Sequence, residues 1–371
     1  MFCKLKKSLY GLKQAPRAWF KKFHTTICAS GLRQSSHDHS MFLRETSAAM
    51  IILLIYVDDI IITGNDTAGI FDIKAILHSS FHMKDLGALT YFLGLEVTYT
   101  SNGLGLNQTK YTCDIIREAN LTDDKVAHTP MEVNVKYKND DGKPISDPTH
   151  YRKIVGSLVY LTMTRPDISF AVHILSQFVS DPRQLHLAAL HRVIQYLKGS
   201  IRRGIFFPSS SMLNVKGFTD ADWAGCPDSR RSTTGWCMFL GDSLISWKCK
   251  KQDRVSKSST EAEYRSMSTA CSEIVWLQRL LDELRVKLNE PTQLFVDNMS
   301  AIQIANNPVF HERTKHIEVD CHYIRELLQQ GLITLPHIKT EHQLADIFTK
   351  AKTRGRHEFL LDKLMLKSAS I

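Results

Sequence analysis

The sequence lacks the patterns that mark zinc-binding, secreted and membrane-spanning proteins. Its eight cysteines form no CxxC pair and no Cys/His spacing that would close a zinc site, so they are expected to be buried thiols of an intracellular protein. Residues 2–10 alternate lysine with apolar side chains and contain no signal-peptide core. The apolar run at 51–64 falls below the roughly 18 to 20 residues that span a bilayer, and it contains two aspartates. We therefore expect a cytoplasmic protein, with the nucleus as a second compartment, and no membrane partner.

Acidic residues are also scarce at the start of the chain, where none precedes Asp38. The formal net charge is +9 and the pI is near 9.0, which suits a polyanionic partner such as RNA or DNA. Aromatic residues interleave with the early basic ones. A solvated face is the alternative explanation of the same charges. The basic residues before Asp38 are Lys4, Lys6, Lys7, Lys13, Arg17, Lys21, Lys22 and Arg33.

Two adjacent carboxylates, Asp58 and Asp59, interrupt the apolar run at 51–64. Like charges beside a hydrophobic core are costly unless a cation compensates them, and oxygen ligands suit a divalent cation. Because β-branched segments flank the pair, 51–57 and 60–63 are predicted to form a hairpin with the aspartates at its tip. An ordinary acidic turn is the alternative, although Asp-Asp is a weaker turn pair than Asn-Gly or Asp-Gly.

The periodicity of apolar residues predicts the remaining elements of the first half. Pro16 begins a helix with Trp19, Phe20, Phe23 and Ile27 on one face. Further predictions are a helix capped at 65–67, a strand at 91–98 that turns back through 104–107, a helix at 111–120, a linker at 136–148, three short helices within 149–198, and a second linker at 199–214.

From residue 215 onward, strands and helices follow one another in a mixed α/β order. The predicted strands are 215–219, 236–240, 244–248, 294–296 and 332–338, and the helices are 258–284, 317–328 and a last one that carries Asp346. Acids at the ends of neighbouring strands and on a helix that crosses them converge at one end of a sheet, where they suit a pair of Mg²⁺ ions.

Each of these acids also has a structural explanation. Asp222 and Asp228 suit turns, and Asp297 suits a helix N-cap. Glu261 with Ser258, or Glu263 with Thr260, fits a capping box.

Several long motifs in a fixed order resemble the reverse transcriptase of copia-type LTR retrotransposons, over nearly the whole chain. The motifs are SLYGLKQAPRAW (8–19), YVDD (56–59), MKDLG (83–87), YFLG (91–94), VGSL (155–158) and TRPDI (164–168). The resemblance implies a partial palm and thumb-like domain at 1–135 and a helical connection at 149–198. It also implies that the segment 12–17 lies against nucleotide and template. The candidate nucleic-acid contacts are Lys13, Gln14, Arg17, Lys21 and Lys22.

The later acids resemble those of the ribonuclease H domain of the same elements, which implies a mixed five-stranded sheet at 215–350 and a tail at 351–371. The matching motifs are TDADW (219–223), STEAEY (259–264), VDN (296–298) and LAD (344–346). The metal ligands that the resemblance implies are Asp220, Glu263, Asp297 and Asp346. We prefer Glu263 to Glu261 because it lies one turn into the helix, although both stay open. An integrase would place its glutamate after both aspartates, so the order favours ribonuclease H.

The resemblance implies hydrolysis of RNA in an RNA–DNA hybrid by two Mg²⁺ or Mn²⁺ ions. His342, on the loop before Asp346, is a candidate for product exchange or proton transfer. It also implies that Asp58 and Asp59 are catalytic and metal-binding in a polymerase, together with a carboxylate upstream of residue 8 that the sequence does not contain. We therefore expect the polymerase to be inactive alone and the ribonuclease to be retained. The alternative is a non-catalytic nucleic-acid-binding remnant. The sequence does not indicate an oligomeric state.

Overall fold

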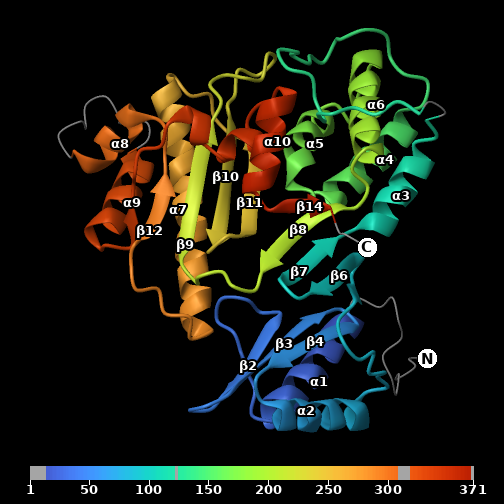
Figure 1. Cartoon of the computed structure of the whole chain (residues 1–371), viewed down its shortest axis with the longest axis vertical. Coiled ribbons are helices and arrows are strands. Elements are labelled where there is room, and N and C mark those ends of the chain that lie inside the picture. The colour runs from blue at the N-terminus through green and yellow to red at the C-terminus, as the bar shows by residue number, and fades with distance from the viewer. Residues whose placement is uncertain (1–13, 122–123, 308–317, 369–371) are drawn as a thin grey trace, which may run out of the picture. The chain divides into compact units, whose positions relative to one another are not determined.

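The computed structural model describes residues 14–121, 124–307 and 318–368, and its mixed α and β architecture is the fold class that the sequence predicts (Figure 1). The chain forms two compact units, residues 1–89 and 90–371. Each is described by itself. No helix of the described residues is long and apolar enough to cross a membrane.

The first unit is an antiparallel sheet with two helices. The strands lie in the order β1 (Arg33–Gln34), β2 (Met41–Glu45), β3 (Met50–Tyr56) and β4 (Asp59–Gly64), with α1 (Ala15–Ala29) and α2 (Thr67–Ser80) against them. Ile51, Leu53 and Ile55 alternate as buried residues along β3 and pack on the helices. The strand period of two therefore decides which face of the hairpin meets the core.

Both predicted helices of this unit form. Pro16 lies in the first turn of α1, and Asp66 caps α2 by accepting a hydrogen bond from the backbone N–H of Gly69. Phe23 is buried as predicted, whereas Phe20 is 36% exposed, so the apolar face of α1 is narrower than its sequence indicates.

The second unit begins with a sheet whose strands come from distant parts of the chain. Its order is β14 (Leu366–Ser368), β8 (Arg203–Pro208), β7 (Gly103–Asn107), β6 (Leu95–Thr100) and β5 (Tyr91–Phe92). The predicted single strand at 91–98 is wrong: Gly94, at φ +77°, turns the chain between β5 and β6. The segments predicted as a linker and a tail contain β8 and β14, because Ile205 and Leu366 pair across these strands and enter the core.

A helical segment lies between β7 and β8 in sequence, where a helix at 111–120 and three short helices within 149–198 are predicted. It comprises α3 (Thr109–Glu118), α4 (Pro148–Leu161), the 3₁₀ turn η1 (Pro166–Ile168), α5 (Ser169–Ser176) and α6 (Gln184–Lys198). Within this segment, a fully buried ion pair joins Arg165 to Asp167 at 2.8 Å, and the Tyr196 hydroxyl also donates a hydrogen bond to Asp167. Tyr196 in turn contacts His357 of α10 (Arg354–Lys363), so this segment and the C-terminal helix share one buried polar network.

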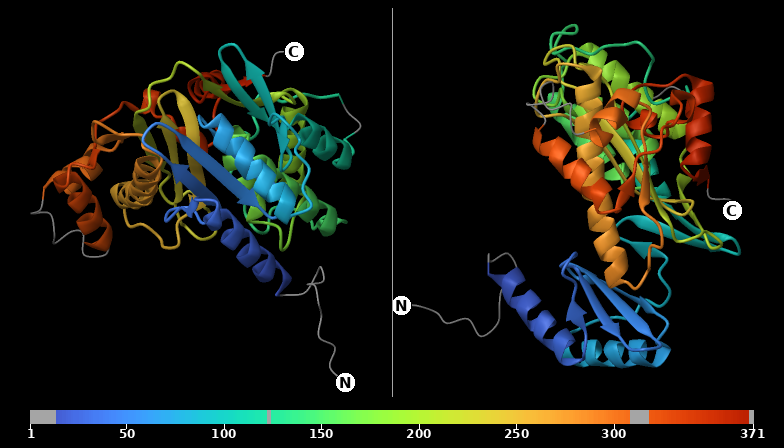
Figure 2. Two further views of the ribbon diagram at one scale, coloured as in Figure 1. Left: turned by 90° about the horizontal axis from the view of Figure 1, so that it is seen from below. Right: turned by 90° about the vertical axis from the view of Figure 1, so that its left-hand side faces the viewer.

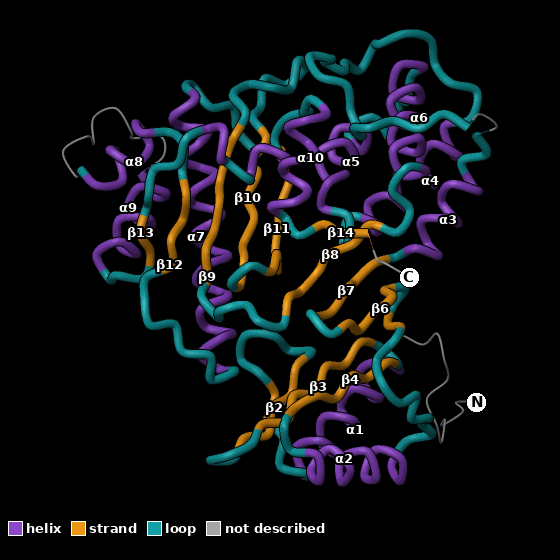
Figure 3. The backbone as a smooth tube through the Cα atoms, viewed as in Figure 1, coloured by secondary structure: helices purple, strands orange, loops and turns teal. Residues whose placement is uncertain are grey.

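The other sheet of this unit is the predicted mixed five-stranded one (Figure 3). Its order is β11 (Ser243–Lys251), β10 (Thr233–Leu240), β9 (Val215–Ala221), β12 (Thr292–Phe295) and β13 (Ile333–Thr334). The strands from β11 to β9 are antiparallel, whereas β12 runs parallel to both of its neighbours.

Helices cover both faces of this sheet. On β10, Trp236 and Met238 face a core with α7 (Ser259–Glu283), α8 (Met299–Asn306) and α9 (Glu318–Gln329). The alternate residues Cys237 and Phe239 face α10 and the 3₁₀ turn η5 (Ala345–Phe348). Figure 2 shows α7 running along its face of the sheet.

Candidate metal centre

The first candidate site, the pair Asp58 and Asp59, lies at the end of the β3–β4 hairpin. Tyr56 pairs with Asp59, so the two-residue tip is Val57-Asp58 and not the predicted Asp58-Asp59. Val57 has φ +51°, a left-handed conformation that is rare for a β-branched residue. Both carboxylates are exposed. The structure therefore gives this pair the environment of a solvated turn.

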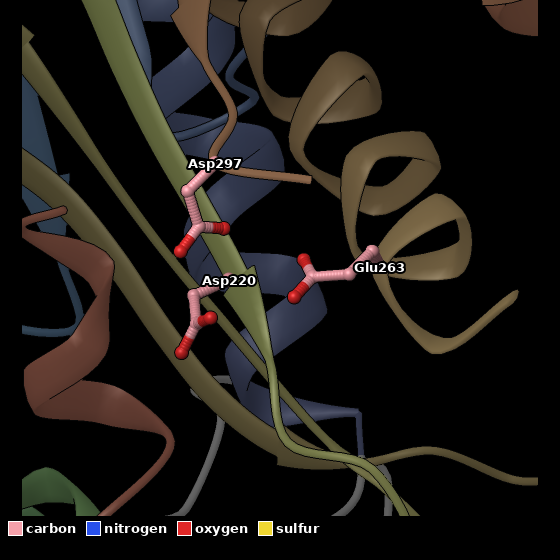
Figure 4. Close-up of side chains that lie close together, drawn as sticks. All are labelled: Asp220, Glu263 and Asp297. Atoms are coloured by element: carbon pink, nitrogen blue, oxygen red, sulfur yellow. The ribbon is translucent and has the colours of Figure 1, made fainter. Parts of the chain in front are cut away.

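The second candidate site is a convergence of three carboxylates in the five-stranded sheet. One carboxylate oxygen of each of Asp220, Glu263 and Asp297 lies within 4.8 Å of the others. Figure 4 shows Asp220 and Asp297 side by side, with Glu263 reaching toward them from its helix. Across the described ranges, this is the only group of three or more acidic, histidine or cysteine side chains arranged to hold a metal ion.

The sheet register explains why the two aspartates meet. Parallel strands β9 and β12 pair Phe218 with Phe295, and Asp220 and Asp297 each follow two residues later. The rings of these phenylalanines stack with centroids 4.9 Å apart, which fixes the register beside the site.

Ser266 fastens the helix that carries Glu263 to the strand that carries Asp220. Its hydroxyl donates to the backbone oxygen of Asp220 at 2.8 Å and also contacts the Thr219 hydroxyl. Because Ser266 lies three residues after Glu263 on α7, the same face of the helix presents both side chains to β9. Glu263 is thereby held over the end of the sheet.

The choice between Glu261 and Glu263 has a clear geometric outcome. Glu261 belongs to the cap of α7: its backbone N–H donates to Ser258, and its carboxylate accepts from the backbone of Lys257 and from Arg265. Only Glu263 reaches the aspartates. The alternative capping box of Thr260 with Glu263 is therefore not the arrangement that forms.

Asp346 lies next to this cluster but is held by cations. Lys350 Nζ lies 2.6 Å from Oδ1 of Asp346, Lys352 Nζ lies 3.0 Å from Oδ2, and Arg356 lies 3.4 Å from Oδ2. Lys350 also lies 3.6 Å from Oδ2 of Asp220. Asp346 is thus linked to the three-carboxylate cluster through an ammonium group.

The electrostatics separate these acids. Burial raises the pKa of Asp220 to about 6. Burial, followed by the charges of Asp220 and Asp297, also raises the pKa of Glu263 well above its ordinary value. Burial opposes ionisation of Asp346 too, but Lys352 and Lys350 outweigh it and lower the pKa of Asp346. Positive charge therefore outweighs burial at Asp346 but not at Asp220 or Glu263.

The donor set fits a hard divalent cation. Carboxylate oxygens from β9, from α7 and from the segment between β12 and α8 lie within 4.8 Å of one another. Oxygen is the ligand atom that Mg²⁺ and Mn²⁺ prefer. The buried Oε2 atom of Glu263 accepts no hydrogen bond. A buried carboxylate oxygen without a donor is costly, and a bound cation would satisfy it.

Several residues that the sequence analysis did not single out support the cluster. Thr349 donates its hydroxyl to Asp220, Thr340 donates to Asp297 at 2.9 Å, and the buried Gln343 donates to the backbone of Thr219. Lys350 follows Asp346 by four residues, a spacing that predicts an ion pair on a helical turn. The contacts of Thr349 with Asp220 and of Thr340 with Asp297 join distant parts of the chain, so no local spacing predicts them.

Gly235 makes room for this support. It pairs with Asp220 across β9 and β10, and a Cβ there would lie 2.6 Å from Thr349 Cγ2 and 2.9 Å from Phe348 Cβ. A residue with no side chain is therefore needed for η5 to pack beside Asp220.

The remaining candidates lie elsewhere. Asp228 lies in a turn, as predicted, and accepts a hydrogen bond from the backbone N–H of Asn139. Asp222 directly follows β9 and accepts one from the backbone N–H of Thr233 on the neighbouring strand β10. His342, on the 3₁₀ turn η4 (Thr340–His342), is exposed and lies 3.6 Å from Glu341.

The predicted nucleic-acid contacts fall at the start of α1. Lys13 lies outside the described residues, whereas the N-cap residue Gln14 and the helix residues Arg17 and Lys21 are exposed. Lys22 donates to the backbone oxygen of Ser80 at 2.9 Å, which fastens α1 to the end of α2.

The chain is similar to known proteins over most of its length. The family "Reverse transcriptase (RNA-dependent DNA polymerase)" matches residues 1–133. The chain is 43% identical over 362 residues to the Retrovirus-related Pol polyprotein from transposon RE1 of Arabidopsis thaliana, a match that covers 98% of this chain and 25% of the relative. It is 37% identical over 370 residues to the corresponding polyprotein from transposon TNT 1-94 of Nicotiana tabacum, covering 96% of this chain and 28% of the relative.

A shorter relative is matched over most of its own length. The chain is 34% identical over 271 residues to a Saccharomyces cerevisiae protein named for transposon Ty5-1, covering 72% of this chain and 87% of the relative. Among solved structures, the foamy viral protease-reverse transcriptase in complex with dsDNA aligns with a TM-score of 0.47 and 14% identity, over 90% of this chain and 60% of that one. The chain spans about a quarter of the length of the plant polyproteins. It belongs to the Pol polyprotein family of copia-type retrotransposons.

Proposed function

We propose that this chain is a divalent-metal-dependent ribonuclease that hydrolyses the RNA strand of RNA–DNA hybrids. The observation that carries the proposal is the convergence of Asp220, Glu263 and Asp297, whose oxygens lie within 4.8 Å of one another. The order of these acids along the chain and the mixed five-stranded sheet that supports them agree with this function. Mg²⁺ or Mn²⁺ bound here supplies activation of water and neutralisation of charge on a phosphate.

The residues of the chain have distinct roles in this reaction. Asp220, Glu263 and Asp297 would hold one cation, and Asp220 with Asp346 would hold the second of a two-metal site. Thr349 and Thr340 fix the orientation of the two aspartates by donating hydrogen bonds to them. Ser266 keeps Glu263 at a constant distance from the strand. This preorganisation limits the reorganisation needed when a phosphodiester enters.

The polymerase half of the family activity is expected to be silent in this chain by itself. Asp58 and Asp59 are exposed, and none of the residues that the structure describes joins them as a third metal-binding side chain. A two-metal phosphoryl-transfer site needs carboxylates on both sides of the ions. We therefore assign hybrid hydrolysis, and not DNA synthesis, to the chain.

The expected substrate follows from charge. The chain carries a formal net charge of +9, and the exposed face of α1 presents Gln14, Arg17 and Lys21. Contacts of the charged residues Arg17 and Lys21 with phosphates would release counterions, so hybrid binding should weaken steeply with added salt. RNA and DNA are the proposed partners, at an intracellular location.

The test is cleavage of a labelled RNA–DNA hybrid in Mg²⁺ by the wild-type chain beside Asp297→Asn. Wild type should cleave the RNA strand, and Asp297→Asn should not, while both unfold at similar temperatures. Asp58→Asn is the matched control, because it removes a carboxylate from the exposed hairpin and should leave cleavage unchanged. Cleavage by wild type and Asp297→Asn at equal rates would contradict the assignment.

The alternative function is binding without catalysis, as a remnant of an element. It is favoured by the cations around Asp346, since that carboxylate is already paired. Hybrid binding in EDTA and in Mg²⁺ separates the two functions. Equal binding in both conditions, with no cleavage in Mg²⁺, would identify the protein as a binding remnant.

A further inference from the structure

Lys350 extends its ammonium group between two of the candidate metal-binding carboxylates. Its Nζ lies 2.6 Å from Oδ1 of Asp346 and 3.6 Å from Oδ2 of Asp220. Burial lowers the pKa of Lys350, but the charges of Asp220 and Asp346 outweigh it and raise the pKa above its ordinary value. A permanent positive charge therefore stands where these two carboxylates would share a metal ion.

We propose that the ammonium group of Lys350 competes with the second divalent cation for the position between Asp220 and Asp346. This inference rests on the proposed function, because it takes the four carboxylates as a metal site. It adds that the two cation positions are unequal: the one at Asp220, Glu263 and Asp297 is open, and the other is occupied by a side chain that must withdraw.

The accessibility of the neighbouring cations supports this role. The Lys350 side chain is 45% exposed, so it can turn toward solvent by rotation about its own bonds. Lys352, in contrast, is only 8% exposed and contacts the other oxygen of Asp346. When Lys350 withdraws, Lys352 and Arg356 still compensate Asp346. Lys350 is therefore the replaceable cation and Lys352 the fixed one.

The cation position at Asp220, Glu263 and Asp297 has less direct contact with Lys350 than the position between Asp220 and Asp346 has. In the part of the chain that the structure describes, no ion pair joins Lys350 to Glu263 or Asp297. Its nearer contact to Asp220 is with Oδ2, the oxygen that also accepts the Thr349 hydroxyl. Removing the Lys350 charge should thus strengthen the second cation position more than the first.

The experiment measures Mn²⁺ binding to the whole chain without nucleic acid, from the electron paramagnetic resonance signal of free Mn²⁺. Wild type should bind one Mn²⁺ tightly and a second one more weakly. In Lys350→Gln, the second Mn²⁺ should bind at least about tenfold more tightly, because a full charge a few ångströms away is removed. Lys350→Arg keeps the charge and should resemble wild type. Asp297→Asn should weaken the first Mn²⁺, which locates it.

Thermal unfolding supplies a readout that a purely structural role would not reproduce. In EDTA, Lys350→Gln leaves Asp220 and Asp346 without their shared cation and should lower the melting temperature by about 2–4 °C. In Mn²⁺, the melting temperature of Lys350→Gln should equal that of the wild type in Mn²⁺. A packing defect would keep the variant below the wild type in Mn²⁺ as well. A second Mn²⁺ that binds Lys350→Gln no more tightly than wild type would overturn the proposal.

The two proposals can fail separately. If the Mn²⁺ affinities behave as described and the wild type does not cleave hybrid, Lys350 keeps its assigned role and the ribonuclease proposal is wrong. If the wild type cleaves hybrid but Lys350→Gln gains no affinity for the second Mn²⁺, the role of Lys350 alone is wrong.

Discussion

The chain carries two sets of carboxylates that look alike in sequence and differ in structure. Asp58 and Asp59 stand at an exposed hairpin end, where water compensates their charge. Asp220 and Glu263 are buried beside Asp297, and burial raises the pKa values of both. An apolar run around two acids therefore does not by itself create a buried carboxylate site, because the hairpin leaves its tip in solvent. Such a site forms where acids from several parts of the fold converge.

The largest expected effect separates the two sets by their contribution to catalysis. Glu263→Gln removes a ligand from the cluster and should lower the rate of hybrid cleavage by about 10²- to 10³-fold or more, the scale for one preorganised electrostatic group. The double substitution Asp58→Asn with Asp59→Asn should leave the rate within about twofold, because it changes only exposed side chains. The measurement is single-turnover cleavage in Mg²⁺. A larger loss from the hairpin substitutions than from Glu263→Gln would reverse the comparison.

A smaller effect tests whether the cluster depends on the turn that supports it. Gly235→Ala places a methyl group against Thr349 and Phe348 and should destabilise the protein by about 1–3 kcal/mol, as overpacking does. The metal-dependent rise in melting temperature should shrink too, since Thr349 holds Asp220. Gly156→Ala is the matched control: it lies on α4 with nothing within 4 Å and should be neutral or stabilising. Equal free energies of unfolding for the two variants would contradict this account.

The sequence predicts the local part of this site well. Ser258 and Leu284 bound the predicted helix, and they are the two caps of α7, because capping and helical periodicity are short-range signals. The positions of Asp220 and Asp297 at or just after strands are equally local. Glu263 could be preferred to Glu261 from its place in the second turn.

The part that the sequence did not predict depends on contacts between distant residues. Thr349 meets Asp220 across 129 positions of the chain. Strand β8 lies in a serine- and proline-containing segment that was predicted as a linker, and it forms because β7 and β14 pair with it on both sides. Tertiary pairing overrides local composition in such places.

A pH titration probes the buried set at an intermediate scale. Burial raises the pKa of Asp220 from 3.8 to about 6, so its protonated form stabilises the metal-free protein at low pH, and that contribution is lost as the pH rises through about 6. A divalent cation needs the ionised form. Stabilisation by Mn²⁺ should therefore be small near pH 5, where Asp220 is about one-tenth ionised, and should grow up to about pH 7.

Melting temperatures with Mn²⁺ and with EDTA, measured across this range, test the titration. The hairpin double variant should follow the wild-type profile, because its carboxylates lie outside the cluster. In Asp220→Asn, the rise between about pH 5 and pH 7 should flatten. If the stabilisation of the wild type by Mn²⁺ does not change with pH, cation binding does not require the loss of a proton from Asp220.

The smallest effect concerns backbone strain at the tip of the exposed hairpin. Val57 has φ +51° and is 67% exposed, so its side chain contributes little packing while its backbone is strained. Val57→Asn should stabilise the protein by about 0.5–1 kcal/mol, since asparagine tolerates the left-handed region at lower cost. Urea unfolding followed by fluorescence and circular dichroism measures this change, with Val133→Asn as an exposed valine control outside the hairpin. If Val57→Asn destabilises the protein as much as the control does, contacts of the Val57 side chain hold the hairpin tip. The description of this tip as a strained, solvated turn would then be wrong, and only the description of the buried, charged cluster would remain.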